Sequence, residues 1–153
     1  MSQKETLTIG DRMSSDPVTI KPDQSIGEAF VLMFERDIRH LPVIEKGKLV
    51  GIVSDRDIRQ FLGKASLSEE DRKQEDRYLR LPVSEVMSRH PLKIKAEAPI
   101  AEGIRIMVER KIGALPVVDR EEKMIGIFTE LDALEYSLHV VERYQEEKTR
   151  KAV

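Results

Sequence analysis

The sequence repeats itself, and this repeat constrains the fold more than any other feature. Shifted by 74 positions, residues 13–44 overlie residues 87–118 with 14 identities in 32 positions, where ordinary residue usage gives roughly two by chance. Farther along, Gly51-Ile52 overlies Gly126-Ile127 at a shift of 75. The extra residue falls between two apolar runs, where a hairpin turn tolerates an insertion. A chain of 153 residues made of two copies is expected to form two similar units.

The first half of each copy reads as a strand followed by a helix. In the first copy, Val18-Thr19-Ile20 form a short strand, and Ser25 with Glu28 form a capping box that opens the helix. Four apolar residues then recur at helical spacing and are expected to face the core: Ile26, Ala29, Phe30 and Met33. The second helix of this kind is predicted at 100–110, with Pro99 near its start.

The second half of each copy reads as a hairpin followed by a helix. In the first copy the predicted strands are 41–44 and 49–53, joined by a polar turn, and a short helix covers 55–62. In the second copy the strands are 115–118 and 124–128. The pattern predicts an α+β fold of two βαββα repeats plus a C-terminal helix.

The expected organisation has four parts. The repeats cover residues 7–62 and 82–138, a charged linker covers 63–81, and a helical tail covers 139–153. Eight of the nine residues from Glu69 to Arg77 are charged, which indicates a solvated linker or an exposed helix. Apolar residues continue at helical spacing after the second repeat, at Leu134, Leu138, Val141 and Tyr144.

Composition excludes several functions. The net charge of −2 gives no overall attraction to nucleic acid or to an anionic membrane. The absence of cysteine excludes disulfides, thiolate zinc sites and cysteine nucleophiles. No apolar run has the length of a membrane span or of a signal peptide, so a cytoplasmic protein is expected. The three histidines are isolated and no glycine-rich phosphate loop is present, so neither a metal site nor an enzyme is expected.

The best candidates for a binding site are Ser54 and Asp57, at the point where a predicted strand ends and a predicted helix begins. A carboxylate there can accept hydrogen bonds from both hydroxyls of a ribose. The serine hydroxyl and the helix N-terminus favour a phosphate. Thr129 and Asp132 repeat the arrangement in the second copy. The same pattern also caps helices, and the sequence leaves both interpretations open.

These segments together resemble a pair of cystathionine-β-synthase (CBS) domains, also called a Bateman module. The segments that carry the resemblance are 38–43 (Ile-Arg-His-Leu-Pro-Val) and 51–57 (Gly-Ile-Val-Ser-Asp-Arg-Asp), with their partners at 112–119 and 126–132. Within the family they are similar to bacterial acetoin-utilisation B-type proteins. The resemblance implies that the two repeats pack with pseudo-twofold symmetry and leave a cleft between the two halves. It also implies an adenosine ligand such as AMP, ADP, ATP or S-adenosylmethionine, no required cofactor, and frequent dimerisation.

The resemblance also suggests which side chains contact the ligand. Arg39 and His40 occupy a position that often holds a phosphate-binding base, and Arg56 adds a charge. The alternative for Arg39 and His40 is an exposed loop pair without a ligand role. Their second-copy counterparts, Gly113, Ala114 and Leu131, cannot replace them. The first strands are expected near the adenine: Val18, Thr19 and Ile20, and Leu92, Lys93 and Ile94. Core packing is the alternative for the apolar residues, and the sequence leaves open whether the repeats exchange this strand.

The sequence therefore predicts a regulatory or sensor module rather than an enzyme. It would bind an adenosine-containing small molecule and form a homodimer, and a protein partner would receive the signal. The alternative is a dimeric interaction scaffold that works without a ligand.

Overall fold

The computed structural model describes residues 7–63 and 69–151, which divide into two compact units. One unit spans Pro17–Pro91 and is called the repeat-1 unit. The other, the repeat-2 unit, combines the chain up to Asp16 with the chain from Leu92 onward. Both are α+β, as predicted, and each is described by itself.

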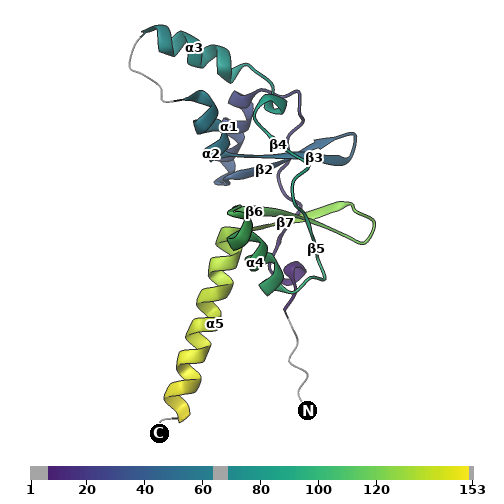
Figure 1. Cartoon of the computed structure of the whole chain (residues 1–153), viewed down its shortest axis with the longest axis vertical. Helices are drawn as coiled ribbons and strands as arrows, with labels where there is room; N and C mark the ends of the chain where they lie inside the picture. Colours follow the sequence, from purple (N-terminus) through teal and green to yellow (C-terminus); the bar gives the residue numbers. More distant parts are fainter. Residues whose placement is uncertain (1–6, 64–68, 152–153) are drawn as a thin grey trace. The chain divides into compact units, whose positions relative to one another are not determined.

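The repeat-1 unit has a three-stranded sheet in the order β2-β3-β4 (Figure 1). Strands β2 (His40–Glu45) and β3 (Lys48–Ser54) form the predicted hairpin, with His40 opposite Ser54. Strand β4 (Ser88–Arg89) adds to the far side of β3. The remaining elements are α1 (Ile26–Arg36), α2 (Asp55–Leu62), α3 (Glu69–Leu79) and the 3₁₀ helix η2 (Val83–Glu85).

The repeat-2 unit has a four-stranded sheet in the order β1-β7-β6-β5. Strands β6 (Ala114–Val118) and β7 (Met124–Thr129) form the second predicted hairpin. Short strands flank it, β1 (Ser14–Ser15) beside β7 and β5 (Ile94–Lys95) beside β6. The helices are the 3₁₀ helix η1 (Ile9–Asp11), α4 (Ile100–Arg110) and α5 (Glu130–Lys151).

The start of each sequence repeat belongs to the unit built by the other repeat. Strand β1 precedes the first repeat's helix but pairs with β7, and β4 precedes the second repeat's helix but pairs with β3. Glycines make this close approach feasible, since a Cβ on Gly51 would lie 2.5 Å from the Met87 sulfur. Gly126 stands in the same relation to the Met13 sulfur, also at 2.5 Å. The unit boundaries thus fall at residues 16/17 and 91/92, about ten residues after each sequence repeat begins.

The core of the repeat-1 unit confirms most of the predicted helix face. Ile26, Ala29 and Met33 of α1 are buried against the sheet. The prediction for Phe30 is wrong, because this side chain is 43% exposed. It lies at the edge of the buried stripe, beside the exposed Val31 and toward Phe34 one turn on. These three side chains form a separate apolar face on α1.

The predicted strand 18–20 is reduced to a single parallel bridge between Ile20 and Val43. The Ile20 amide donates to the Pro42 carbonyl at 3.0 Å, and the Ile44 amide donates to the Ile20 carbonyl at 2.9 Å. Pro17 precedes the segment and has no amide donor with which to extend the ladder.

Both the predicted linker and the predicted tail contain helix, α3 in the linker and the end of α5 in the tail. An exposed helix in the linker is one of the two structures that its run of charged residues predicts. The end of α3 packs back on its unit, where the Tyr78 ring meets Phe61 edge to face at 5.6 Å. Helix α5 runs for 22 residues and carries the predicted stripe of Leu134, Leu138 and Val141 on an exposed surface. Among the helices that the structure describes, none is long and apolar enough to cross a membrane.

Candidate ligand-binding turns

In the repeat-1 unit, Ser54 and Asp57 form a capping box at the point where β3 ends and α2 begins. The Ser54 amide and hydroxyl both donate to Asp57 Oδ2, at 2.8 and 2.6 Å. The Asp57 amide donates back to Ser54 Oγ at 3.1 Å. The capping interpretation of this pattern is therefore observed directly.

The repeat-2 unit builds the same turn where β7 ends and α5 begins. The Thr129 amide and hydroxyl donate to Asp132 Oδ2, at 2.7 and 2.8 Å. The Asp132 amide donates to Thr129 Oγ1 at 3.4 Å. Both carboxylates are half-buried, so the two turns are close structural copies.

The cap leaves part of each aspartate for other use. The box employs one carboxylate oxygen, Oδ2, and the second oxygen of Asp57 and of Asp132 is not part of it. An ionised carboxylate has about four acceptor positions, so one aspartate can cap its helix and still accept hydrogen bonds from a ribose.

The first backbone amides of α2 and α5 are less available to a phosphate than the sequence predicts. The Asp55 amide already donates to the Arg39 carbonyl at 3.0 Å, and the Asp57 amide is held by Ser54. In the second unit the Glu130 amide donates to the Gly113 carbonyl at 2.9 Å. Phosphate binding would therefore depend mainly on basic side chains.

The predicted phosphate-binding side chains lie beside the Ser54–Asp57 turn of the repeat-1 unit. His40 begins β2 directly opposite Ser54, Arg39 precedes it on the surface, and Arg56 is exposed in the first turn of α2. At the matching place in the repeat-2 unit, Ala114 lies opposite Thr129. Thus Arg39, His40, Ser54, Arg56 and Asp57 meet at one end of the β2–β3 hairpin.

The first strands stay with their own hairpins. Ile20 pairs with Val43, and Ile94 pairs with Val117, so the exchanged segments are β1 and β4 instead. Ile20 and Ile94 are buried in the two cores, which favours the packing interpretation for both. Their neighbours Val18, Thr19 and Leu92 are at least partly accessible.

Lys93, which is expected near the adenine, contacts an acidic side chain of its own unit. It forms an ion pair with Glu122, which also pairs with Lys95. Hydrogen bonds from these two ammonium groups hold the pKa of Glu122 at about 2. Lys93 is therefore tied to the β6–β7 hairpin turn, and its role as a ligand contact stays a prediction.

The structure contains a third turn with this Ser/Thr-x-x-Asp spacing, which the sequence analysis does not predict. The Thr8 amide and hydroxyl donate to Asp11 at 2.7 and 2.9 Å and fix η1. These hydrogen bonds lower the pKa of Asp11. The Thr-x-x-Asp spacing could have revealed it, and it shows that this spacing alone does not identify a ligand site. Across residues 7–63 and 69–151, no cluster of potential metal ligands occurs.

Comparison with known proteins places the chain in a family. The model of the CBS domain matches residues 9–64 and 83–139, one match for each sequence repeat. The chain belongs to the CBS-domain family. It is similar to a CBS domain-containing protein of Dictyostelium discoideum, with 33% identity over 134 residues that cover 85% of this chain and 90% of that protein.

Solved CBS pairs share the fold and include ligand complexes. A Vibrio cholerae protein named as an acetoin utilization protein (AcuB) is 30% identical, with a TM-score of 0.73 and coverage of 92% of this chain and 97% of that one. CBSX2 in complex with AMP is 31% identical, with a TM-score of 0.70 over 87% and 97% of the two chains. The CBS pair of MJ0100, in complex with 5′-methylthioadenosine and S-adenosyl-L-methionine, is 26% identical, with a TM-score of 0.69 over 92% and 97%.

CBS pairs also occur inside larger enzymes. A homoserine O-acetyltransferase of Methanohalobium evestigatum is 33% identical over 125 residues, which are 81% of this chain but only 23% of that protein. Such matches concern the CBS part and carry no enzyme activity over to this chain.

Proposed function

We propose that this CBS pair is a regulatory module that binds an adenosine compound at its two capped turns. The observation that carries the proposal is the duplicated turn, in which Asp57 and Asp132 each keep one carboxylate oxygen outside the capping box. An oxygen in this position can accept hydrogen bonds from ribose hydroxyls. Solved relatives in complex with AMP, 5′-methylthioadenosine and S-adenosyl-L-methionine support the choice of ligand class.

The two turns should favour different members of this class. The first combines its aspartate with Arg39, His40 and Arg56, which suit AMP, ADP or ATP. The second has Gly113, Ala114 and Leu131 at these positions, which suits a less phosphorylated compound such as S-adenosylmethionine. No catalytic role is proposed for either turn.

The decisive experiment is a thermal-shift titration with AMP, ADP, ATP and S-adenosylmethionine, with GMP, GDP and GTP as controls. A ligand at about 100-fold over its Kd stabilises the native state by about 2.7 kcal/mol. Adenosine compounds should raise the melting temperature and guanine nucleotides should raise it less. No shift with any adenosine compound at millimolar concentration would exclude the proposal. A parallel assay should find the nucleotides unhydrolysed.

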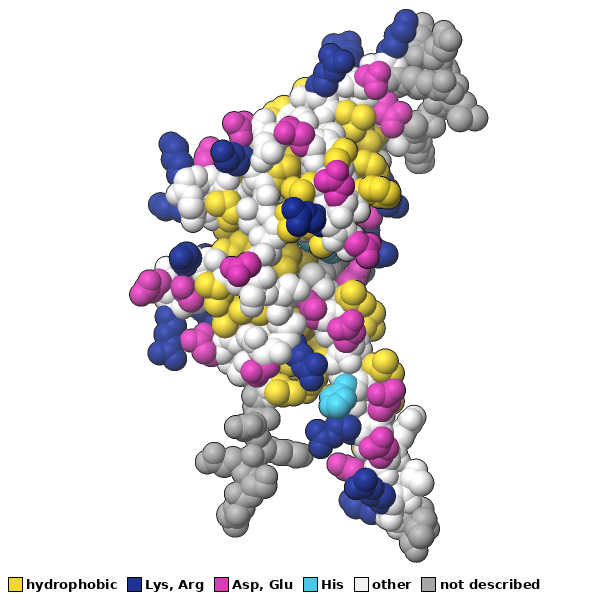
Figure 2. Space-filling view, turned by 180° about the vertical axis from the view of Figure 1, so that it is seen from behind, with side chains coloured by type: hydrophobic (Ala, Val, Ile, Leu, Met, Phe, Trp, Pro, Cys, Tyr) yellow, Lys and Arg dark blue, Asp and Glu magenta, His cyan; other side chains and the backbone are white. Residues whose placement is uncertain are grey.

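We further propose that the module acts as a homodimer in the cytoplasm and passes its signal to a protein partner. Several helices of the described chain carry exposed apolar side chains, including Phe34 on α1 at 83% and Val108 on α4 at 71%. Figure 2 shows hydrophobic side chains, separated by charged ones, along α5 at the lower right. Large apolar side chains exposed on a helix favour association where they form a contiguous patch. A ligand could regulate such a dimer only through a difference in affinity between its states.

The same apolar faces support a second candidate, a scaffold that dimerises without a ligand. Light scattering distinguishes a dimer from the 17.6 kDa monomer. A dimer that shows no thermal shift with any adenosine compound would favour the scaffold. A dimer that is stabilised by one of them would favour the sensor.

A further inference from the structure

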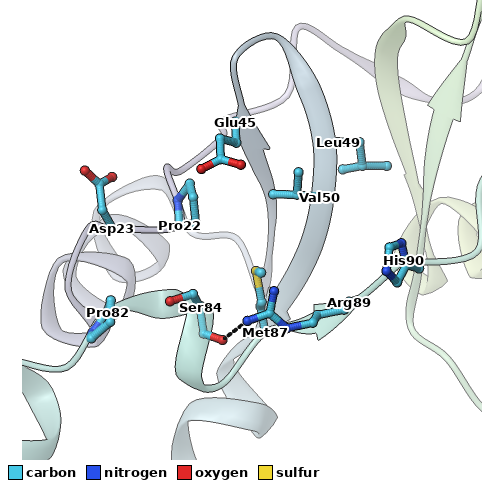
Figure 3. A pocket seen from close by; sticks show the side chains of 10 residues that line it. All are labelled: Pro22, Asp23, Glu45, Leu49, Val50, Pro82, Ser84, Met87, Arg89 and His90. Atoms are coloured by element: carbon cyan, nitrogen blue, oxygen red, sulfur yellow. Dashed lines mark hydrogen bonds between the residues drawn. The ribbon is translucent and has the colours of Figure 1, made fainter.

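The repeat-1 unit contains a pocket of about 500 Å³ that lies away from the capped turn. Glu45, at the end of β2, forms one wall, and Leu49 and Val50 of β3 form a second. Met87 and Arg89 complete it from the β4 side (Figure 3). Glu45 lies at the opposite end of β2 from His40, so the capped turn and the pocket occupy different ends of the hairpin.

Opposite charges line this pocket without neutralising each other. Within the described chain, the carboxylates of Glu45 and Asp23 have no ion-pair partner. The Arg89 guanidinium donates to the Ser84 main-chain carbonyl at 3.2 Å, which positions the group but leaves its charge uncompensated. Figure 3 shows Glu45 at one end of the pocket and Arg89 at the other, with the apolar side chain of Val50 between them.

The repeat-2 unit provides an internal comparison. The equivalent corner of that unit, where the β6–β7 hairpin turn meets β5 and the loop after it, is closed by ion pairs. Arg120 bonds to Glu97 at 2.8 Å and so joins the loop after β5 to the hairpin turn. Lys95 bonds to Glu122 and, at 2.9 Å, to the Asp119 carbonyl.

The repeat-1 unit has acids at two of the corresponding positions and one additional base. Asp23 and Glu45 occupy the positions of Glu97 and Asp119, yet no basic side chain of the described hairpin pairs with them. Arg89 stands where the repeat-2 unit has Ser15. The charges that close one corner internally are therefore left available in the other.

We propose that this pocket binds a small zwitterion of the amino-acid type with an apolar side chain. Its carboxylate would pair with Arg89, with His90 nearby, and its ammonium group would pair with Glu45. The apolar side chain would lie against Val50 and Met87. The lining combines apolar side chains with charged ones, and the volume falls within the range of about 300–1,000 Å³ that is typical of small-molecule sites. The site is independent of the adenosine-binding turns.

The test is a titration of the full chain with leucine and with leucyl-leucine, followed by calorimetry and by amide chemical shifts. Each probe carries both charges, and the dipeptide distinguishes a free amino acid from a short peptide as the ligand. Leucinamide lacks the carboxylate and 4-methylpentanoate lacks the ammonium group. We expect leucine or leucyl-leucine to bind and to shift the amides of Val50 and Arg89, and both truncated analogues to bind at least 10-fold more weakly.

Variants then assign the two charges. Glu45→Gln and Arg89→Gln should each weaken binding of the zwitterion by about 10- to 100-fold, the range for one charged hydrogen bond. Lys46→Gln, on the same hairpin but outside the pocket lining, should bind as the wild type does. The three replaced side chains belong to exposed residues, and an unchanged melting temperature verifies folding. The proposal is overturned if neither zwitterion binds, if the truncated analogues bind equally well, or if both pocket variants behave as the wild type.

Discussion

Replacing Asp57 separates its capping role from its proposed ligand role. In the structure its Oδ2 accepts hydrogen bonds from the Ser54 amide and hydroxyl at 2.8 and 2.6 Å. Loss of a helix cap costs about 1 kcal/mol of folding stability, or about 2–4 °C in melting temperature for a chain of this size. Loss of one hydrogen bond between a ribose and a charged group costs about 1.5–3 kcal/mol, or roughly 10- to 100-fold in affinity. Asp57→Ala should therefore melt slightly earlier and bind its adenine nucleotide much more weakly.

Helix α1 offers a matched control, since Ser25 and Glu28 form the same capping box and neither belongs to the proposed nucleotide site. The Ser25 amide donates to Glu28 at 2.7 Å, and the Glu28 amide donates to Ser25 Oγ at 3.1 Å. Glu28→Ala should lower the melting temperature but leave nucleotide binding unchanged. Both variants are followed by thermal denaturation and by calorimetry with ADP at a temperature where both are folded. If the two variants bind ADP with the same affinity, Asp57 is only a cap and the ribose assignment is wrong.

Four other outcomes are expected. The double variant Arg39→Ala, His40→Ala should lose the tighter of two unequal ADP sites in calorimetry, whereas two equal sites unaffected by the variant would rule out the asymmetry. Because the pKa of Glu122 is lowered from 4.5 to about 2, its ion pairs stabilise the fold above about pH 4.5 and are lost as the pH falls to about 2. The melting-temperature gap between the wild type and Glu122→Gln should therefore close across that window, and a constant gap would contradict this. Gly51→Ala should destabilise the fold by about 1–3 kcal/mol in urea denaturation, since its Cβ would meet a methionine sulfur at 2.5 Å and a backbone oxygen at 3.0 Å; an unchanged midpoint would refute the close packing. Phe34→Asp should shift light scattering from dimer to monomer without unfolding, because the side chain is 83% exposed, and a persistent dimer would show that this face is not the interface.

The sequence alone was sufficient for the elements that depend on neighbouring residues. Helix α2 begins and ends where predicted, and both hairpins match within one residue at either end. The Ser25 and Glu28 box opens α1 as expected. Hydrogen bonds over three residues and apolar periodicity over two turns are encoded locally, and the duplication supplied each pattern twice.

The candidate site was predicted only in part. The positions of Ser54 and Asp57 follow from spacing, and the structure confirms that they form a cap. Whether the carboxylate also binds ribose cannot be read from the spacing, because Thr8 and Asp11 show the same geometry in another setting. The pocket at Glu45 and Arg89 left no sequence signal, since its lining comes from three segments, 22–23, 45–50 and 82–90, that are separated from one another by more than 20 residues.

The amino-acid sequence by itself determined the duplication, the α+β class and the helix-capping turns. Only the tertiary structure decided that β1 and β4 pair across the repeats, that the strand at Ile20 shrinks to one bridge, and that Phe30 stays exposed. The pairing of β1 and β4 depends on contacts between distant segments, such as Gly51 with Met87 and Gly126 with Met13. Local periodicity specifies which face of an element is apolar, but the partner of that face is chosen by packing and hydrogen bonding in three dimensions.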